Sequence, residues 1–335
     1  MKRIKDFLKK ETVFAVATLL AVISAFFVPP STKYISYIDF KTLITLLVLM
    51  LVVQFFSALG VFDRIIHKIL SAVNNTRGLI MSLVLICFFS AMLITNDVAL
   101  ITFVPFTLLL LGKAGKKNIM IPTVALQTIA ANLGSMLTPI GNPQNLYLYQ
   151  LSKISLPGFI TLMLPYAAVS LLMLLISTLF LPVSSITPIS EDTPGLNTSR
   201  LLVRTVKGVD FFLLLTFISF FILIGNLQNI SAVRTFFEQV IKGREFLCAV
   251  IASQIISNVP AAMMLSGFSD NYTELLAGVN IGGLGTLIAS MASLISYKIY
   301  ASNYGETKGK YLLFFTGINL VFLLPLCFVH FLLMS

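Results

Sequence analysis

A polar, helix-breaking stretch inside a long apolar region constrains this chain more than any other feature of its sequence. Residues 131–145 read ANLGSMLTPIGNPQN and hold three Asn, two Gly and two Pro. Pro lacks a backbone donor and Gly adopts backbone conformations closed to other residues, so a regular helix is interrupted here. In a bilayer, broken backbone persists only where protein buries it or where it lines a polar cavity. We therefore interpret this stretch as an unwound transmembrane segment whose carbonyls and side chains face a binding site.

The second half of the chain repeats this stretch without a gap. NLGSMLTPIGN from Asn132 and NIGGLGTLIAS from Asn280 both fit N-x-G-[S/G]-x-x-T-x-I-[G/A]-[N/S]. Each copy follows a short polar motif in apolar sequence, TND at 95–97 and SNVP at 257–260. Corresponding broken segments in two halves of a membrane protein are the best sequence indication of a transporter's binding site. The alternative is two Gly-rich packing faces, which explains neither the matched Asn and Thr residues nor the preceding motifs.

Composition places the chain among polytopic helical membrane proteins. It has 335 residues, of which 57% are hydrophobic and 11% charged, and its mean hydropathy is +0.96, a combination not found in soluble proteins. The net charge of +10 comes from basic residues in short loops between apolar runs, which is typical of topology determinants and not of a nucleic-acid surface. Cys87, Cys248 and Cys327 lie in apolar runs and are expected to pack in the core. His67 and His330 are isolated near span ends, so neither is expected to be a ligand.

The apolar runs of the first half define a tail, a span and one repeat. We expect residues 1–37 to form an N-terminal tail and a retained first span, because the run ends in FFVPP without a small-x-small cleavage site. The first repeat is then 38–181, with a hairpin at 78–112 and a broken span at 119–149.

The second half follows the same order after a linker. Residues 182–208 are rich in Ser, Thr and Pro and are expected to form a cytoplasmic linker. The second repeat is then 209–335, with a hairpin at 245–268 and a broken span at 275–297.

Basic residues flank both ends of the first predicted hairpin. Arg77 precedes it, and Lys113 and Lys116 follow it. Each arm has about 16 residues, against about 20 for a full crossing, so we favour a re-entrant hairpin that enters from the cytoplasm. The alternative is two short full spans. With the N-terminus inside, most of the 23 Lys and Arg residues are cytoplasmic, and the second hairpin enters from outside.

The sequence thus predicts an all-α polytopic membrane protein of two inverted repeats, each with a re-entrant hairpin and an unwound transmembrane helix. Inverted repeats around a central site are the architecture of alternating access. We expect the protein to reside in the inner membrane with its N-terminus in the cytoplasm.

Three motifs resemble those of the ion transporter superfamily that contains citrate-transporter-like permeases, divalent anion/sodium symporters, arsenite permeases and a sodium/proton antiporter branch. They are LITNDVALITFVPF at 93–106, NLGSMLTPIGNPQN at 132–145 and SNVPAAMML at 257–265. Their order matches over nearly the whole chain. In the symporters each hairpin tip reads Ser-Asn-Thr, whereas TND here resembles the arsenite-permease and antiporter branches, in which an acid follows the Asn.

The predicted site combines uncharged hydrogen-bonding groups, helix ends and unwound backbone. Side-chain amides and hydroxyls can bind the oxygens of an anion, and N-terminal helix ends favour negative charge. The predicted substrate-binding residues are Asn96, Thr138, Pro139, Asn142, Asn258, Pro260 and Thr286.

A coupling cation or proton is expected at the same place, because unwound carbonyls suit Na⁺ and Asp97 is the one acid deep in the apolar region. An Asp can also cap the start of a helix, and the two roles are compatible. The predicted coupling residues, which are also the expected Na⁺ positions, are Thr95, Asn96, Asp97, Asn132, Gly134, Ser135, Ser257, Asn258, Asn280, Gly282 and Gly283.

The leading prediction is a secondary active transporter of a small anion, such as citrate, a dicarboxylate or an inorganic oxyanion, coupled to Na⁺ or H⁺. The first alternative is Na⁺/H⁺ antiport; a remote one is an intramembrane enzyme, which would need a second deep acid or a Ser/His pair. No cofactor is expected except Na⁺. The expected partners are the anion, Na⁺ or H⁺ and the lipid bilayer, with a homodimer left open and no nucleic acid.

Overall fold

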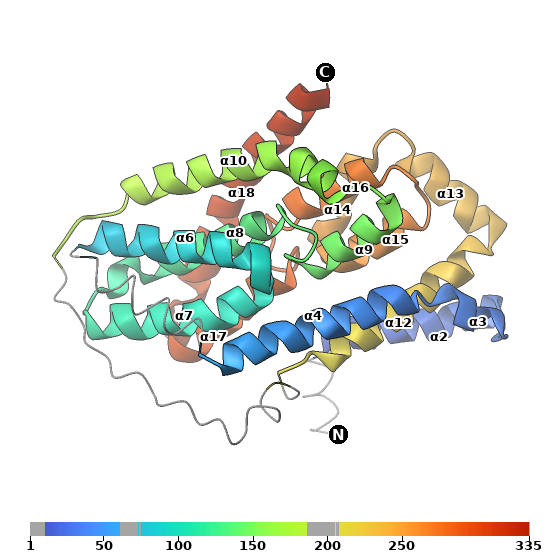
Figure 1. Ribbon diagram of the computed structural model, residues 1–335, viewed down its shortest axis with the longest axis horizontal. Helices are drawn as coiled ribbons and strands as arrows, with labels where there is room; N and C mark the ends of the chain where they lie inside the picture. The colour runs from blue at the N-terminus through green and yellow to red at the C-terminus, as the bar shows by residue number, and fades with distance from the viewer. Residues whose placement is uncertain (1–10, 61–72, 74, 186–204, 206–207, 335) are drawn as a thin grey trace.

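The computed structural model describes residues 11–60, 73, 75–185, 205 and 208–334 (Figure 1). Within them the chain is almost entirely helical, as predicted, and an isolated antiparallel bridge joins Asn75 to Ser185. The predicted tail up to residue 10 and the centre of the predicted linker, 186–204, lie outside the described residues.

Six helices of the described part are long and apolar enough to cross a membrane. They are α4 (Phe40–Ala58), α6 (Thr76–Ile94), α7 (Asn96–Lys113), α10 (Leu156–Leu179), α12 (Phe211–Gln228) and α18 (Lys308–Met334). The predicted first span is α2 (Thr12–Phe27), an apolar helix of 16 residues. Large apolar side chains such as Phe26 and Leu313 are 83% and 80% exposed, as expected of side chains that face lipid. The protein is an integral membrane protein.

Each predicted hairpin is a pair of helices joined at one residue of positive φ. α6 meets α7 at Thr95, with φ 71° and ψ 149°, and α14 (Glu245–Ile256) meets α15 (Asn258–Ser266) at Ser257, with φ 75° and ψ 153°. The chain reverses at each of these residues, so that the two arms lie side by side (Figure 1). We call Thr95–Asp97 the first tip and Ser257–Val259 the second tip.

The two hairpins differ in length. The arms of the second have 12 and 9 residues, too few to cross a bilayer individually. The arms of the first have 19 and 18 residues, longer than the roughly 16 expected from the sequence, against about 20 for a crossing. Their length fits a full crossing as well as a re-entrant path, so the re-entrant path remains a prediction.

Both predicted broken spans are interrupted helices. α8 (Met120–Ser135) stops before residues 136–142, and α9 (Pro143–Ser152) continues beyond them. α16 (Tyr272–Ile281) stops before residues 282–290, and α17 (Met291–Asn303) follows. We call 136–142 the first break and 282–290 the second break. Gly282, Gly283 and Gly285 lie within the second break, whereas in the first half Gly134 is the second-last residue of α8 and Gly141 lies in the break. Gly residues at or just before each break explain why the helix ends there.

The two halves exchange helices at the centre of the molecule. α8 packs on the first hairpin, but α9, beyond the first break, packs on α15 and α16 of the second half. In the same way α16 packs on α14 and α15, whereas α17 packs on α7 and α8. α2, α4 and α12 lie along one side of this core and α10 lies along the opposite side (Figure 1). The tips therefore lie among helices, whereas each break keeps exposed residues, Ile140 in the first and Thr286 and Ile288 in the second.

Candidate functional site

The two tips make the same backbone contact with the breaks. The N–H of Asn96 donates to the carbonyl of Gly141 at 3.1 Å, and the N–H of Asn258 donates to the carbonyl of Ala289 at 2.9 Å. Gly141 and Ala289 occupy the same position of the repeated pattern. The first N–H groups of a helix have no partner within it, so each break satisfies a donor that its tip leaves free. Each tip is thereby fixed to the break of its own half.

The matched Thr residues make a second repeated contact. The hydroxyl of Thr138 donates to the carbonyl of Met92 in α6, and that of Thr286 donates to the carbonyl of Gln254 in α14. Thr286 is exposed. Both hydroxyls are thus bonded to hairpin backbone, and the structure does not bring either one into the central Asn cluster described next. Their predicted contact with substrate remains a prediction.

Asn132 joins the first half to the second. Its Oδ1 accepts a hydrogen bond from the hydroxyl of Ser290 at 3.0 Å, and its Nδ2 donates to Ser293 Oγ at 3.2 Å. Asn132 and Ser290 are 4% and 1% exposed. The amide is therefore held on both sides by the start of α17.

Asn280 makes the reciprocal contacts. Its Oδ1 accepts from Asn142 Nδ2 at 3.2 Å, and its Nδ2 donates to Asn145 Oδ1 at 2.6 Å. Asn142 and Asn145 stand at the start of α9, in the positions that the two Ser partners occupy at the start of α17. Reciprocal contacts of this kind are expected of two units related by a two-fold axis. Whether that axis lies in the membrane plane, which would make the repeats inverted, remains a prediction.

Four helix N-termini converge beside the two tips. A cavity of about 10 Å³, near the minimum for one water molecule, lies among the first residues of α7, α9, α15 and α17. Its polar lining residues are Asn96, Asp97, Gln144, Asn258 and Ser290. Asn96 Nδ2 also donates to Asn132 Oδ1 at 3.1 Å, which connects the first tip to the Asn cluster. The structure thus brings both tips together, as the sequence predicted.

The carbonyls of the breaks are covered by two amide side chains that the sequence analysis did not single out. Asn145 Nδ2 donates at 3.1–3.3 Å to the carbonyls of Ser135, Met136 and Thr138. Gln254 Nε2 donates at 2.8 and 2.9 Å to the carbonyls of Gly282 and Leu284. The signal for Gln254 was a long polar side chain in an apolar arm, three positions before the second tip. Any cation bound by these oxygens would share them with an amide donor.

The matched glycines of the pattern are packing positions. A Cβ on Gly134 would lie 2.0 Å from the carbonyl oxygen of Phe88 in α6, and one on Gly282 would lie 2.9 Å from Cα of Val250 in α14. Gly283 has a different neighbour, since a Cβ there would lie 2.9 Å from Asn258 Nδ2. The first two glycines allow each broken helix to approach its hairpin, and the third leaves space for the amide of the second tip. The predicted prolines, Pro139 and Pro260, are buried.

Asp97 lies in the first turn of α7 between two cavities. Among the described residues its buried Oδ1 has no hydrogen-bond partner. The larger cavity has about 110 Å³, separates α7 from α4 and α12, and is mostly apolar. Its polar residues include Gln54 and Asp210, and Asp210 caps α12 by accepting the N–H of Leu213 at 3.0 Å. A carboxylate oxygen without a partner beside a cavity is suited to bind a cation or a proton.

Ser135 and Ser257 complete the predicted set of coupling residues. Ser135 accepts from Asn142 Nδ2 at 3.0 Å and donates to the carbonyl of Asn132 at 2.8 Å. Ser257 is buried at the second tip, with its hydroxyl 3.5 Å from the carbonyl of Ala289. Within the described residues, no cluster of three or more His, Cys, Asp or Glu side chains could hold a metal ion. Oxygen ligands from the tips and breaks are thus the available chemistry for Na⁺.

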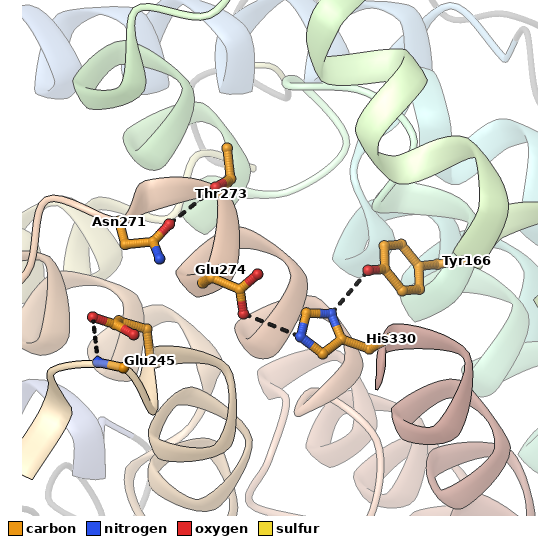
Figure 2. Close-up of polar contacts among 7 residues, drawn as sticks. Tyr166, Glu245, Asn271, Thr273, Glu274 and His330 are labelled. Atoms are coloured by element: carbon orange, nitrogen blue, oxygen red, sulfur yellow. Dashed lines mark hydrogen bonds and ion pairs between the residues drawn. The ribbon is translucent and has the colours of Figure 1, made fainter. Parts of the chain in front are cut away.

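The sequence analysis missed a second polar cluster, at the end of α18. His330 is isolated in the sequence, but in the structure its ring contacts Glu274 and Tyr166 (Figure 2). The three residues lie more than fifty positions apart in the sequence, so no local pattern connects them.

Comparison with known proteins gives consistent matches. The family model described as citrate transporter matches residues 7–273, which include both tips and the first break. The uncharacterized transporter MJ0456 of Methanocaldococcus jannaschii is 32% identical over 304 residues, which cover 82% of this chain and 85% of that protein. The inner membrane protein YbiR of Escherichia coli is 31% identical over 334 residues, covering 87% of this chain and 88% of the relative.

Proposed function

Since this chain belongs to the citrate transporter family and is a membrane transporter, we propose that it is a secondary active transporter of a small anion, coupled to Na⁺ or H⁺. The observation that carries the proposal is the convergence of four helix N-termini on one small cavity beside the two tips. Helix N-termini carry partial positive charge, so a group of them favours an anion even where their first N–H groups are bonded within the protein, as at Asn96 and Asn258.

The side chains at this place support the same substrate class. Amides of Asn96 and Asn258 line the cavity, and among its described lining residues there is no Lys or Arg. An anion held by dipoles and amides alone is bound weakly enough to be released, as transport requires. A co-bound cation would add the missing charge.

Asp97 is the proposed coupling residue. It is the acid at the convergence of helix ends, and its Oδ1 is left without a partner among the described residues. A cation or proton bound at Asp97 would neutralise the carboxylate next to the anion. Anion binding and cation binding would then be mutually favourable, which is the thermodynamic basis of symport.

In this proposal, alternating access results from movement of the two halves of the chain relative to each other. The reciprocal contacts of Asn132 and Asn280 join the halves at the centre, and we propose that the repeats are inverted in the membrane. We further propose that the N-terminus is cytoplasmic, because most of the Lys and Arg residues are then inside. We also propose that the protein resides in the inner membrane, as the name of the E. coli relative states for that protein. Single Cys residues at Gly78 and Gly112 should both label from the cytoplasmic side. Labelling from opposite sides would show that the first hairpin is two full spans.

Na⁺/H⁺ antiport is the second candidate. The cavity that Asp97 shares with Asp210 favours it, because two carboxylates beside one cavity could exchange a cation for protons without an organic substrate. The two candidates make different demands on the central cavity of about 10 Å³, since only the first requires it to widen in another state so that an anion can enter.

Transport in proteoliposomes separates them. Purified protein would be tested with labelled citrate, succinate, phosphate and arsenite under an imposed Na⁺ or pH gradient. We expect uptake of one of these anions to depend on one gradient. Na⁺ flux driven by a pH gradient without any anion dependence would instead establish antiport, and absence of both fluxes would overturn the proposal.

A further inference from the structure

A row of three titratable side chains from three helices lies where α10, α16 and α18 meet (Figure 2). His330 Nε2 is 3.0 Å from Glu274 Oε2, and His330 Nδ1 is 2.9 Å from the hydroxyl oxygen of Tyr166. The His330 side chain is 3% exposed and that of Glu274 is 18% exposed. The imidazole also stacks on Phe246, with ring centroids 3.5 Å apart and planes 7° apart. Packing and two polar contacts therefore fix the ring in one orientation.

The row begins at a cavity and ends in the protein interior. Glu274 and His330 line a cavity of about 280 Å³ at the ends of α14, α16 and α18, whereas Tyr166 lies behind them and is 1% exposed. The other charged residues of this cavity are Arg244 and Glu245, at the start of α14. Glu245 accepts hydrogen bonds from Gly243 N and Ser269 Oγ, both at 3.2 Å. Protons from water can thus reach Glu274 and His330 through the cavity.

Both protonation states of the His330 ring are satisfied by these partners. In the neutral ring, Nε2–H donates to the Glu274 carboxylate, and Nδ1 accepts from the Tyr166 hydroxyl. Uptake of one proton at Nδ1 makes both ring nitrogens donors, and the Tyr166 oxygen then accepts. A Tyr hydroxyl serves either way because it is both donor and acceptor. Neither state leaves a buried ring nitrogen without a partner, which is the usual obstacle to a titrating group in the interior.

We propose that Glu274 and His330 form a proton-binding site that is distinct from Asp97. This site controls how firmly α16, the first part of the second broken span, is held to α18. Glu274 lies in the first turn of α16, and Asn280, near the other end of that helix, bonds Asn142 and Asn145 in the central cluster. Binding of a proton turns the His330–Glu274 contact from a hydrogen bond to a neutral ring into an ion pair, which is stronger. Tyr166 is the positioning residue that accepts or donates at Nδ1.

Histidine NMR tests the site without measuring transport. The chain has one other histidine, His67, so His67→Gln leaves a single imidazole to observe. The ring of His330, labelled with ¹³C and ¹⁵N in detergent-solubilised full-length protein, is observed from about pH 5 to pH 8, the range in which histidine in general changes charge. We expect the signals to show one protonated ring nitrogen at the upper end and two at the lower end. A ring that keeps one protonation state across this range while the protein stays folded would overturn the proposal.

Substitutions of Glu274 and Asp97 test which carboxylate contacts the His330 ring. Glu274→Gln is expected to move proton uptake by the ring, and so its titration curve, to lower pH, because it removes the carboxylate that the protonated ring contacts. Asp97→Asn is the matched control and should leave the curve unchanged, since Asp97 lies at the first tip. An unchanged curve in Glu274→Gln would overturn the proposed pair, whatever the transported substrate is.

Hydrogen exchange tests the link to the broken helix. Amide exchange rates of residues 272–281 are measured in His330→Gln and in the parent protein, and their ratio is compared at about pH 5 and pH 8, the ends of the range in which histidine changes charge. The ratio removes the intrinsic pH dependence of exchange, which both proteins share. We expect protection by His330 to be several-fold greater at the lower pH. An equal ratio at both pH values would overturn the control of α16 by this site.

Discussion

The two tips have the same backbone and different chemistry. Thr95 and Ser257 adopt nearly equal φ and ψ angles, and the Asn after each donates its N–H to the equivalent carbonyl of a break. The next residue is Asp97 in the first tip and Val259 in the second. A helix reversal of this kind therefore needs the Asn and the break but not the acid.

The cavities beside the tips differ in the same way. The one next to the first tip contains Asp97 and Asp210. The one next to the second hairpin has about 540 Å³ and is lined almost entirely by apolar residues of α2, α12 and the hairpin, such as Ile255 and Ile256. The comparison teaches that the repeat duplicates the framework of the site, while ionisable chemistry is present at one tip. The predictions below test this division.

Loss of the acid should have the largest effect. Asp97→Asn keeps the size and capping ability of the side chain but fixes it as neutral, so we expect gradient-driven transport to fall by about 100-fold or more. The measurement is transport in proteoliposomes under an imposed Na⁺ or pH gradient. Val259→Thr, at the equivalent position of the second tip, is the control and should keep most of the activity. Full activity of Asp97→Asn would show that the chemical difference between the tips has no role in coupling.

The packing glycines should show the next effect, and it should be unequal. Gly134→Ala places a methyl group against backbone of α6 that cannot move aside, and we expect it to lower the free energy of unfolding by about 3 kcal/mol. Gly282→Ala has a less severe overlap and should cost about 2 kcal/mol. Denaturant unfolding in detergent measures both. Equal tolerance of Ala at the two positions would mean that the first broken helix is not packed more tightly than the second.

The amides that cover the breaks provide a third comparison. Asn145→Leu leaves buried carbonyls of the first break without a donor, and we expect a loss of about 2 kcal/mol. Gln254 is less buried than Asn145, so water can replace its amide, and Gln254→Leu should cost about 1 kcal/mol. Denaturant unfolding in detergent measures the loss of stability in both variants. A larger loss of stability in Gln254→Leu than in Asn145→Leu would contradict the argument that water replaces the amide of Gln254 more easily than that of Asn145.

The backbone of the tips should give the smallest effect, and it is stabilising. Gly adopts the positive φ of a tip without strain, which outweighs its greater freedom in the unfolded chain. We expect Thr95→Gly to raise the free energy of unfolding by about 1 kcal/mol and Ser257→Gly by about half as much, because Thr is β-branched. Thermal unfolding of the two variants measures the difference. Destabilisation by both would show that the side chains of the tips contribute more than their backbone strain.

The sequence predicted the positions of the helices, tips and breaks because each depends on local composition. Apolar runs, Pro and Gly determine where a helix in a membrane begins and ends. It did not predict the exchange of α9 and α17 between the halves, because the partner of a helix is set by tertiary packing. For the same reason it missed the amide of Gln254 on the second break and the pairing of His330 with Glu274. It did not predict either that the hydroxyls of Thr138 and Thr286 bond hairpin backbone, and their contact with substrate remains a prediction.

The contacts of Asn132 with the start of α17 also affect biosynthesis, because Asn132 is made well before these partners. Its partner Ser290 lies 158 residues later in the chain, which at ribosomal rates is a delay of roughly 10–30 s. During that interval the Oδ1 of Asn132 can accept from Asn96 in the same half, but its Nδ2 has not yet met its acceptor Ser293, and an unsatisfied polar group in hydrocarbon costs several kcal/mol. The nascent first half must therefore be sheltered by the translocon, by water or by lipid headgroups until the last third of the chain is made. A cell that shortens this delay, or a chaperone that covers it, would raise the yield of folded protein without changing the final structure.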